Sequence, residues 1–169
     1  YPAFNAKTTV KNNKSDFSQN IQSEVNRIDS FVEQALFYAR STNIEKDYII
    51  HTIQLADLIR TCVKKHSRQL INAHAEIHID SLDFKVFSDT KWLDFIIGQI
   101  LSNSIKYRRQ PFILNFFAEE QPNNIILTIE DNGIGIPSND LSKVFEKGFT
   151  GENGRVFAKS TGIGLYLCK

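Results

Sequence analysis

The stretch IILTIEDNGIGI, residues 125 to 136, decides the fold predicted for this 169-residue chain. Its first half predicts a strand, and Asp131 follows directly at the end of that strand. A carboxylate in this position can accept a hydrogen bond from an exocyclic amino group such as that of adenine. Gly133 and Gly135 remove side chains where a flat base would approach the backbone. A simple Asp-Asn-Gly turn is the alternative interpretation.

A second glycine-containing turn lies further along the chain, in the stretch STGIGLYL at residues 160 to 167. It places Gly162 and Gly164 at the start of a predicted helix. Unpaired N–H groups and the helix dipole favour an anion there, so the turn is a candidate phosphate site. A plain helix cap after a loop would give the same pattern.

The helix predicted upstream, at residues 91 to 107, supplies a polar face. Gln99, Asn103 and Lys106 are spaced i, i+4 and i+7, while apolar residues take the opposite face. The amide oxygen of Asn103 suits Mg²⁺, and Lys106 can neutralise phosphate charge. Alone, these residues would be read as a solvated helix face. Together with the two glycine turns they predict one site for a nucleotide and its metal.

Residues 137 to 159 separate the two turns and form a loop that is long for a compact domain. We expect this segment to act as a lid over bound nucleotide. Its phenylalanines would anchor it and its cations would reach the phosphates; these residues are Phe145, Phe149, Phe157, Lys147, Arg155 and Lys159.

The predicted elements give an α+β domain, a two-layer α/β sandwich. Helices are expected at residues 55–72 and 91–107, and strands at 76–80, 85–89, 112–118 and 125–130. Ser88, Asp89 and Thr90 supply capping residues for the second of these helices. The last two strands are expected to pair antiparallel. We therefore predict a mostly antiparallel sheet that helices cover on one face.

The N-terminal part has a different character. Residues 1–19 are polar without a sustained period, which predicts a tail or linker. Residues 20–46 form the next segment, in which a helix is predicted that ends before Ser41. Its apolar seam is formed by Ile21, Val25, Ile28, Val32, Ala35 and Ala39. One interpretation is an amphipathic helix packed on its own domain. The other is half of a helical hairpin that pairs with a partner chain.

Composition excludes several classes of function. The net charge of +1 without a basic block gives no case for nucleic acid as a ligand. Cys62 and Cys168 lack the spacing of a zinc site or a disulfide framework. None of the four histidines is predicted to be catalytic, and His66 is expected to be a packed histidine. The chain has no methionine and no apolar run of the roughly 20 residues that span a bilayer, and we expect it to be a fragment.

The motifs together resemble the Bergerat-fold ATPases, the group of gyrase, Hsp90, histidine kinases and MutL. There is no GxxxxGK[ST], so the chain does not resemble P-loop proteins. In the resemblance, which covers about residues 50–169, QILSNSIKY matches the N box, DNGIGI the G1 box, VFEKGFT the F box and STGIGLYL the G2 box. The resemblance implies that Asn103 binds Mg²⁺ and that Asp131 binds the adenine amino group. The other residues it implies for ATP binding are Lys106, Tyr107, Gly133, Gly135, Ile136, Lys147, Phe149, Thr161, Gly162, Gly164 and Leu165.

One position separates branches of this group. Clamp-type members carry a glutamate four residues before the metal-binding asparagine, where this chain has Gln99. An amide cannot take a proton from water, so rapid hydrolysis of ATP is not expected. The F-box match and the preceding helix resemble sensor histidine kinases, in particular the small intramembrane-sensing kinases of Gram-positive bacteria. The resemblance implies transfer of the γ-phosphoryl group to a histidine on a separate helical hairpin.

The same resemblance implies the setting of the intact protein. It would be a homodimer with a response-regulator partner, and its catalytic part would be cytoplasmic, with membrane segments that are missing here. Residues 1–19 contain no histidine, so this fragment is not expected to phosphorylate itself. Two alternatives stay open: a serine kinase of the anti-sigma type, and a non-catalytic nucleotide-binding module that signals by dimerising.

Overall fold

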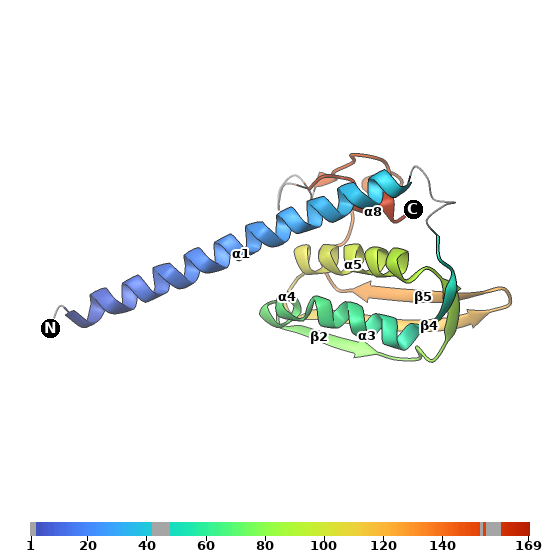
Figure 1. The fold of residues 1–169 in the computed structure, drawn as a ribbon, viewed down its shortest axis with the longest axis horizontal. Coiled ribbons are helices and arrows are strands. Elements are labelled where there is room, and N and C mark those ends of the chain that lie inside the picture. Colours follow the sequence, from blue (N-terminus) through green and yellow to red (C-terminus); the bar gives the residue numbers. More distant parts are fainter. Residues whose placement is uncertain (1–2, 42–47, 153, 155–159) are drawn as a thin grey trace. The chain divides into compact units, whose positions relative to one another are not determined.

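The computed structural model describes residues 3–41, 48–152, 154 and 160–169. The chain divides into two compact units, Tyr1–Asn43 and Ile44–Lys169. The first contains one long helix, and the second is an α+β domain (Figure 1). No helix within the described ranges combines the length and the hydropathy needed to cross a bilayer.

Helix α1 spans Ala3–Ser41, so it begins far earlier than the sequence predicted. The expectation of an irregular polar tail over residues 1–19 is therefore wrong from Ala3 onward. The physical reason is that no proline or glycine interrupts residues 3–41, so nothing breaks a helix that the later residues favour. Local pairs add to it, such as the ion pair of 3.0 Å between Arg27 and Glu24.

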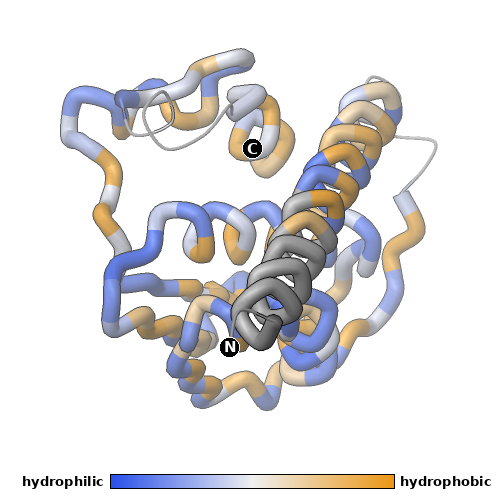
Figure 2. Tube along the Cα trace, turned by 90° about the vertical axis from the view of Figure 1, so that its left-hand side faces the viewer, coloured by the Kyte–Doolittle hydropathy of each residue, from blue (hydrophilic) through white to orange (hydrophobic). Residues whose placement is uncertain are grey.

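The apolar seam of α1 is solvent-exposed in this structure. Ile21, Val25, Ile28 and Val32 have exposed fractions between 43% and 59%. Hydrophobic and hydrophilic residues alternate along the described side chains of the helix (Figure 2). The stripe continues toward the N-terminus with Phe17, which is 69% exposed.

The second unit contains two sheets rather than the single sheet expected. Strands β1 (His51–Gln54) and β3 (Lys85–Ser88) form an antiparallel pair. The other sheet has the order β2 (Ala75–Ile79), β4 (Phe112–Gln121), β5 (Asn124–Asp131). Strand β2 is parallel to β4, and β4 is antiparallel to β5.

This topology confirms the predicted β4–β5 hairpin and the expectation of mostly antiparallel pairing, since β2–β4 is the one parallel pair among the described strands. The strands predicted at 76–80 and 85–89 do not pair with each other, because β3 pairs with β1, which was not predicted. Alternation along a strand shows that one face is buried, but it does not identify the neighbouring strand. The parallel pair is possible because the connection from β2 to β4 includes a long helix, as parallel strands require.

Helices α3 (Leu55–Lys65) and α5 (Thr90–Lys106) cover one face of the three-stranded sheet (Figure 1). The core lies between these layers, and β4 contributes every second residue to it. The fully buried side chains are Ile59, Cys62, Ile97, Leu101, Phe112, Leu114 and Phe116. Each fully buried Ile, Leu or Phe side chain stabilises such a core by about 1.5–3 kcal/mol.

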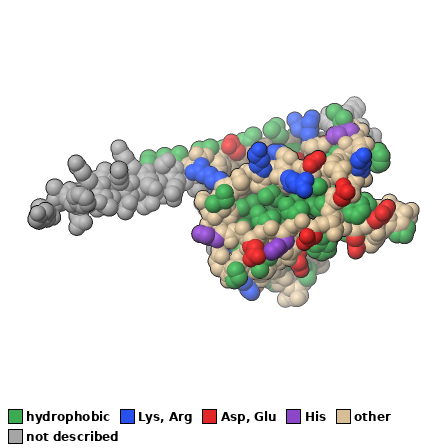
Figure 3. All heavy atoms as spheres, turned by 90° about the horizontal axis from the view of Figure 1, so that it is seen from below, with side chains coloured by type: hydrophobic (Ala, Val, Ile, Leu, Met, Phe, Trp, Pro, Cys, Tyr) green, Lys and Arg blue, Asp and Glu red, His purple; other side chains and the backbone are tan. Residues whose placement is uncertain are grey.

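Some hydrophobic side chains remain at the surface of the domain. Ile71 and Phe87 are 72% and 77% exposed. Seen from below, hydrophobic side chains gather inside a rim of charged residues and histidines (Figure 3). The core is therefore one-sided, with the buried layer between the sheet and its helices.

The helix predicted at residues 55–72 is interrupted at His66. Helix α3 ends at Lys65, and the short helix α4 spans Ser67–Asn72. The imidazole Nδ1 of His66 lies 2.9 Å from the carbonyl oxygen of Cys62, one turn back in α3. His66 is half-buried, which confirms the expectation of a packed histidine.

Asp89 caps helix α5, as its sequence predicted. Its carboxylate accepts hydrogen bonds from the N–H groups of Lys91 at 2.7 Å and Trp92 at 3.3 Å, and also from Ile49 at 2.8 Å. Burial raises the pKa of Asp89, but these three backbone donors outweigh burial and hold the pKa below the ordinary value of 3.8. The N-terminal end of α5 is thereby fixed to the chain that precedes β1.

Candidate nucleotide site

The C-terminal half of α5 carries the first group of predicted site residues. Asn103 and Lys106 are half-buried, whereas Ile97 and Leu101 on the opposite face are buried in the core. Gln99, which shares their spacing, is only 9% exposed and is therefore not part of a solvated face. The helix thus presents an amide and an amine next to each other at its end.

Asp131, the last residue of β5, lies against this part of α5. Its Oδ2 accepts a hydrogen bond of 2.8 Å from the hydroxyl of Ser104, the residue that follows Asn103. Its Oδ1 accepts a hydrogen bond of 2.9 Å from the N–H group of Gly133. The carboxylate predicted to bind adenine and the amide predicted to bind the metal are therefore brought together.

Sequence reasoning missed Ser104. The residue is 3% exposed and occupies the apolar stripe of α5, at i, i+4 and i+7 from Ile97 and Leu101. A hydroxyl on a buried stripe requires an acceptor, since unpaired buried polar groups are costly. That mismatch between residue type and position was the available signal.

The first glycine after Asp131 has a packing role that was not predicted. A Cβ at Gly133 would lie 2.6 Å from the carbonyl oxygen of Tyr107 and 2.7 Å from Oδ1 of Asp131. The N–H group of Ile134 donates to the same Tyr107 oxygen at 3.0 Å. Gly133 is thus required because the loop crosses the end of α5 at backbone distance, and room for a base is not its first role. Gly135 has a φ of 71°, and a Cβ there would meet nothing within 4 Å.

The second glycine turn also meets the end of α5. Lys106 Nζ donates a hydrogen bond of 2.7 Å to the hydroxyl of Ser160, and it lies 4.8 Å from the ring centre of Tyr107. The hydroxyls of Tyr107 and Ser160 are 3.4 Å apart. The candidate phosphate turn and the predicted phosphate-binding lysine are therefore adjacent.

Gly162 packs against the segment that matches the F box. It has a φ of 67°, and a Cβ there would lie 2.7 Å from the carbonyl oxygens of Gly148 and Phe149. The N–H group of Gly148 donates to the carbonyl oxygen of Gly162 at 2.9 Å. Any side chain at position 162 would therefore clash with backbone as well as strain it.

A helix follows this turn, as predicted. Helix α8 spans only Gly164–Leu167, and it contacts α5. The N–H group of Ile163 is satisfied by the Thr161 hydroxyl at 3.3 Å.

The other predicted residues lie around this cluster. Ile136, Lys147 and Thr161 are exposed, and Phe149 and Leu165 are half-buried. In the candidate lid, the carboxylate of Asp140, in the short helix α6 (Ser138–Leu141), accepts from the N–H group of Glu152 at 3.1 Å. The lid residues Arg155, Phe157 and Lys159 lie outside the described residues.

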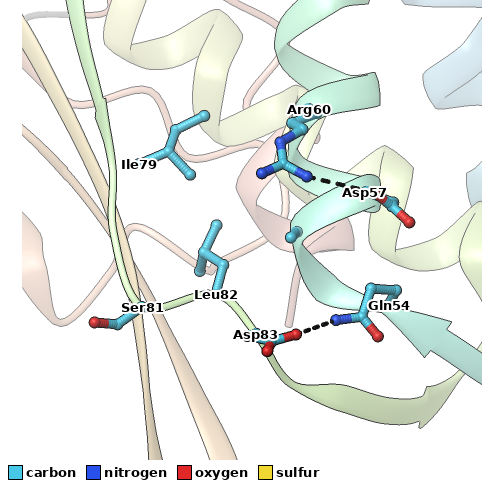
Figure 4. Close-up of a pocket in the computed structure, with 8 residues that line it drawn as sticks. Gln54, Asp57, Arg60, Ile79, Ser81, Leu82 and Asp83 are labelled. Atoms are coloured by element: carbon cyan, nitrogen blue, oxygen red, sulfur yellow. Dashed lines mark hydrogen bonds and ion pairs between the residues drawn. The ribbon is translucent and has the colours of Figure 1, made fainter.

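A distinct hollow of about 450 Å³ lies elsewhere in the domain, between α3 and the connection from β2 to β3 (Figure 4). Gln54 donates to Asp83 at 2.8 Å, and Arg60 forms an ion pair of 3.5 Å with Asp57. The Gln54–Asp83 hydrogen bond joins the two sides of the hollow, whereas Arg60 and Asp57 pair along helix α3. None of the predicted ATP-binding residues lines it.

The types of side chain present limit which metal ion could bind and whether a cysteine could act as a nucleophile. Among the described residues, no group of three or more His, Cys, Asp or Glu side chains could hold a metal ion. A single amide such as Asn103 fits Mg²⁺ that is held mainly by phosphates and water. Burial raises the pKa of Cys62 to about 12 and that of Cys168 to about 11, so neither thiol forms a thiolate at neutral pH.

Comparisons with known proteins place these features in a family. Residues 88–169 match the family described as histidine kinase-, DNA gyrase B-, and HSP90-like ATPases. The sensor histidine kinase YxdK of Bacillus subtilis is 36% identical over 155 residues, which cover 89% of this chain and 47% of that protein. The sensor protein kinase GraS of Staphylococcus aureus is 32% identical over 146 residues, which cover 85% of this chain and 42% of that protein. The chain therefore spans less than half the length of these relatives.

Solved structures agree on the fold. The Acinetobacter baumannii histidine kinase AdeS has a TM-score of 0.68 and 21% identity, covering 89% of this chain and 68% of that chain. The histidine kinase ThkA in complex with the response regulator protein TrrA has a TM-score of 0.63 and 18% identity, covering 79% of this chain and 40% of the kinase chain. The predicted α+β fold of the kinase ATPases is confirmed.

Proposed function

We propose that this chain, which belongs to the family of histidine kinase-, DNA gyrase B- and HSP90-like ATPases, is the ATP-binding catalytic portion of a two-component sensor histidine kinase. The chain spans 47% of YxdK, so the activity of the whole protein is inferred from the part seen here. The predicted residue roles belong to this proposal.

The observation that carries the proposal is the convergence of three segments on one end of α5. Ser104 is bonded to Asp131 at 2.8 Å, and Lys106 is bonded to Ser160 at 2.7 Å. Asn103 directly precedes Ser104 on the same helix. The end of α5 therefore carries an amide for a metal and a lysine for phosphates. The carboxylate acceptor for a base comes from β5 and contacts the same turn of the helix.

Each group has a defined part in the reaction. Asp131 would accept from the adenine amino group, and Lys106 would offset phosphate charge at the end of α5. Asn103 would hold Mg²⁺, which supplies charge neutralisation at the β- and γ-phosphates. The chain contributes positioning and electrostatics, which is most of what phosphoryl transfer requires.

The proposed transfer moves the γ-phosphoryl group from ATP to a histidine ring nitrogen on a hairpin helix outside this chain. A nitrogen–phosphorus bond forms, the bond from the γ-phosphorus to the bridging oxygen breaks, and ADP leaves with that electron pair. Gln99 cannot act as a base toward water, which favours transfer over hydrolysis.

The proposal extends to assembly. Two copies of α1 would bury the stripe formed by Ile21, Val25, Ile28 and Val32, since apolar residues in a heptad-like seam favour helix pairing. A response regulator would receive the phosphoryl group, as the name of the ThkA–TrrA complex suggests for that kinase. The relatives are named sensors, which supports a cytoplasmic catalytic domain attached to a membrane protein.

The decisive experiment uses the intact protein that contains this chain, incubated with radiolabelled Mg-ATP. We expect a phosphoprotein whose label is lost in acid and kept in alkali, as phosphohistidine is, and no label in the Asp131→Ala variant. A label that is stable in acid and lost in alkali would identify a serine kinase instead. Binding of Mg-ATP without any label would support a non-catalytic module.

A further inference from the structure

We infer that Ser104 is a positioning residue that determines base specificity: it fixes the carboxylate of Asp131 as a hydrogen-bond acceptor, so that the site selects purines with an amino group at C6. The inference rests on the proposed function. It assigns a role to a residue that lies in neither the predicted base set nor the predicted phosphate set.

The first step is the burial of the Ser104 hydroxyl. The residue is 3% exposed, so its hydroxyl must find its acceptor within the protein. Two acceptors lie in range: Oδ2 of Asp131 at 2.8 Å and the carbonyl oxygen of Ile100 at 3.1 Å. A hydroxyl has one proton, and an ionised carboxylate is the stronger acceptor. Ser104 therefore donates to Asp131.

The second step is the restraint on the carboxylate. Ser104 holds Oδ2 from the helix, and the N–H group of Gly133 holds Oδ1 from the loop at 2.9 Å. Rotation of the Asp131 side chain would break both hydrogen bonds. An ionised carboxylate has about four acceptor sites, so two donors leave capacity for a ligand. Asp131 is solvent-exposed, so that capacity is accessible to a ligand.

The third step is chemical discrimination. A carboxylate that is held by donors stays an acceptor, and it matches the N–H of a 6-amino purine. A 6-oxo purine would place a carbonyl oxygen against it, and unsubstituted purine would leave its free lone pairs unpaired. Sites that hydrogen-bond a specific substrate group reject analogues without it far more strongly than apolar pockets do. Without Ser104, the carboxylate loses one of its two restraints and part of this discrimination.

The test compares Ser104→Ala with Ser102→Ala, a matched control because Ser102 is exposed on the same helix. Calorimetry with Mg²⁺ measures the affinity of the chain for ATP, GTP and purine riboside triphosphate, which lacks the amino group. Ser104→Ala should weaken ATP binding about tenfold, as expected for one hydrogen bond to a charged group, and purine riboside triphosphate less than about twofold. The ratio of ATP to GTP affinity should fall, whereas Ser102→Ala should change neither.

Equal losses for ATP and the amino-free analogue would show a purely structural role for Ser104 and overturn the inference. Unchanged ATP affinity in Ser104→Ala would overturn it as well. If Ser104→Ala does not fold, the isosteric pair Ser104→Thr and Ser104→Val decides: only the hydroxyl-bearing threonine should keep the ATP preference, and equal preference in both would refute the role. Failure of the unmodified chain to bind ATP would refute the proposed function and is thus a separate outcome.

Discussion

The two ends of helix α5 each hold an aspartate, but the two carboxylates face different partners. Asp89 at the N-terminal end is 2% exposed and accepts from three backbone N–H groups, those of Ile49, Lys91 and Trp92. Asp131 at the C-terminal end is exposed and accepts from Ser104 and Gly133. One carboxylate is saturated by protein donors, and the other keeps acceptor capacity.

This difference teaches how one helix can serve stability and recognition without conflict. Substitutions at the N-terminal end should change the free energy of unfolding and leave nucleotide affinity alone. Substitutions at the C-terminal end should do the reverse. The following experiments test that division, in order of decreasing expected effect.

Replacing Asp131 with alanine should have the largest effect. Loss of the acceptor for the base should weaken ATP binding about 100-fold, since hydrogen bonds to charged groups contribute about 1.5–3 kcal/mol. The free energy of unfolding should change little, because the Ser104 hydroxyl retains the carbonyl oxygen of Ile100 at 3.1 Å. Calorimetry and urea unfolding measure the two quantities. A large loss of stability with intact affinity would reverse the assignment of this end.

Replacing Asp89 with alanine should lower the free energy of unfolding by about 2 kcal/mol, because the helix loses its cap and the N–H group of Ile49 loses its acceptor. ATP affinity, measured well below the unfolding temperature, should stay within about threefold. Asp83→Ala is the control, since Asp83 is an exposed carboxylate that bonds only a side chain, Gln54, at 2.8 Å. Equal destabilisation by both variants would argue against the cap.

Replacing Gly162 with alanine should weaken ATP binding about tenfold, because the added Cβ meets the carbonyl oxygens of Gly148 and Phe149. Gly148→Ala is the matched control, since that residue also has a positive φ but open space around its Cβ. The control carries backbone strain alone, about 1 kcal/mol. Equal effects would show that strain, and not the contact with Gly148, sets the position of the turn.

Replacing Asn103 with alanine should weaken ATP binding about fivefold in the presence of Mg²⁺ and hardly at all in its absence. Titrations with and without Mg²⁺ separate the metal-dependent part of the ATP affinity from the metal-independent part. Lys91→Ala, a change at the exposed start of the same helix, serves as the control. A loss that is the same under both conditions would remove Asn103 from the metal site.

The smallest expected effect is the pH dependence of stability. The folded-state pKa of Asp89 lies below the ordinary value of 3.8, so its contribution is present above that pH and is lost as the pH falls through the folded pKa. The free energy of unfolding should fall on acidification below about pH 4. Asp89→Asn should flatten this fall. An identical pH profile in both proteins would contradict the shift.

Sequence patterns predicted those features that depend on neighbours along the chain. The cap at Asp89, the core face of α5 with Ile97 and Leu101, and the β4–β5 hairpin all follow from local spacing. The glycine turns also indicated two segments that meet the C-terminal end of α5. These signals need no information on distant contacts.

Features that depend on distant contacts were missed. The parallel pairing of β2 with β4, and strand β1 as the partner of β3, depend on which segments meet in space. The partners of Asp131 and Lys106, namely Ser104 and Ser160, are separated from them by 27 and 54 residues. The early start of α1 differs from the prediction for another reason: a polar composition without a sustained period does not by itself exclude a helix.

The hydrogen bond between the N–H group of Gly148 and the carbonyl oxygen of Gly162 joins two points that are 14 positions apart in the chain. The two ends of the intervening segment therefore lie next to each other. A change in the number of residues between them need not move Gly148 or Gly162. Closing a longer loop costs little more, about 0.6 kcal/mol for each doubling. Insertions and deletions in related proteins should therefore be tolerated between these two glycines.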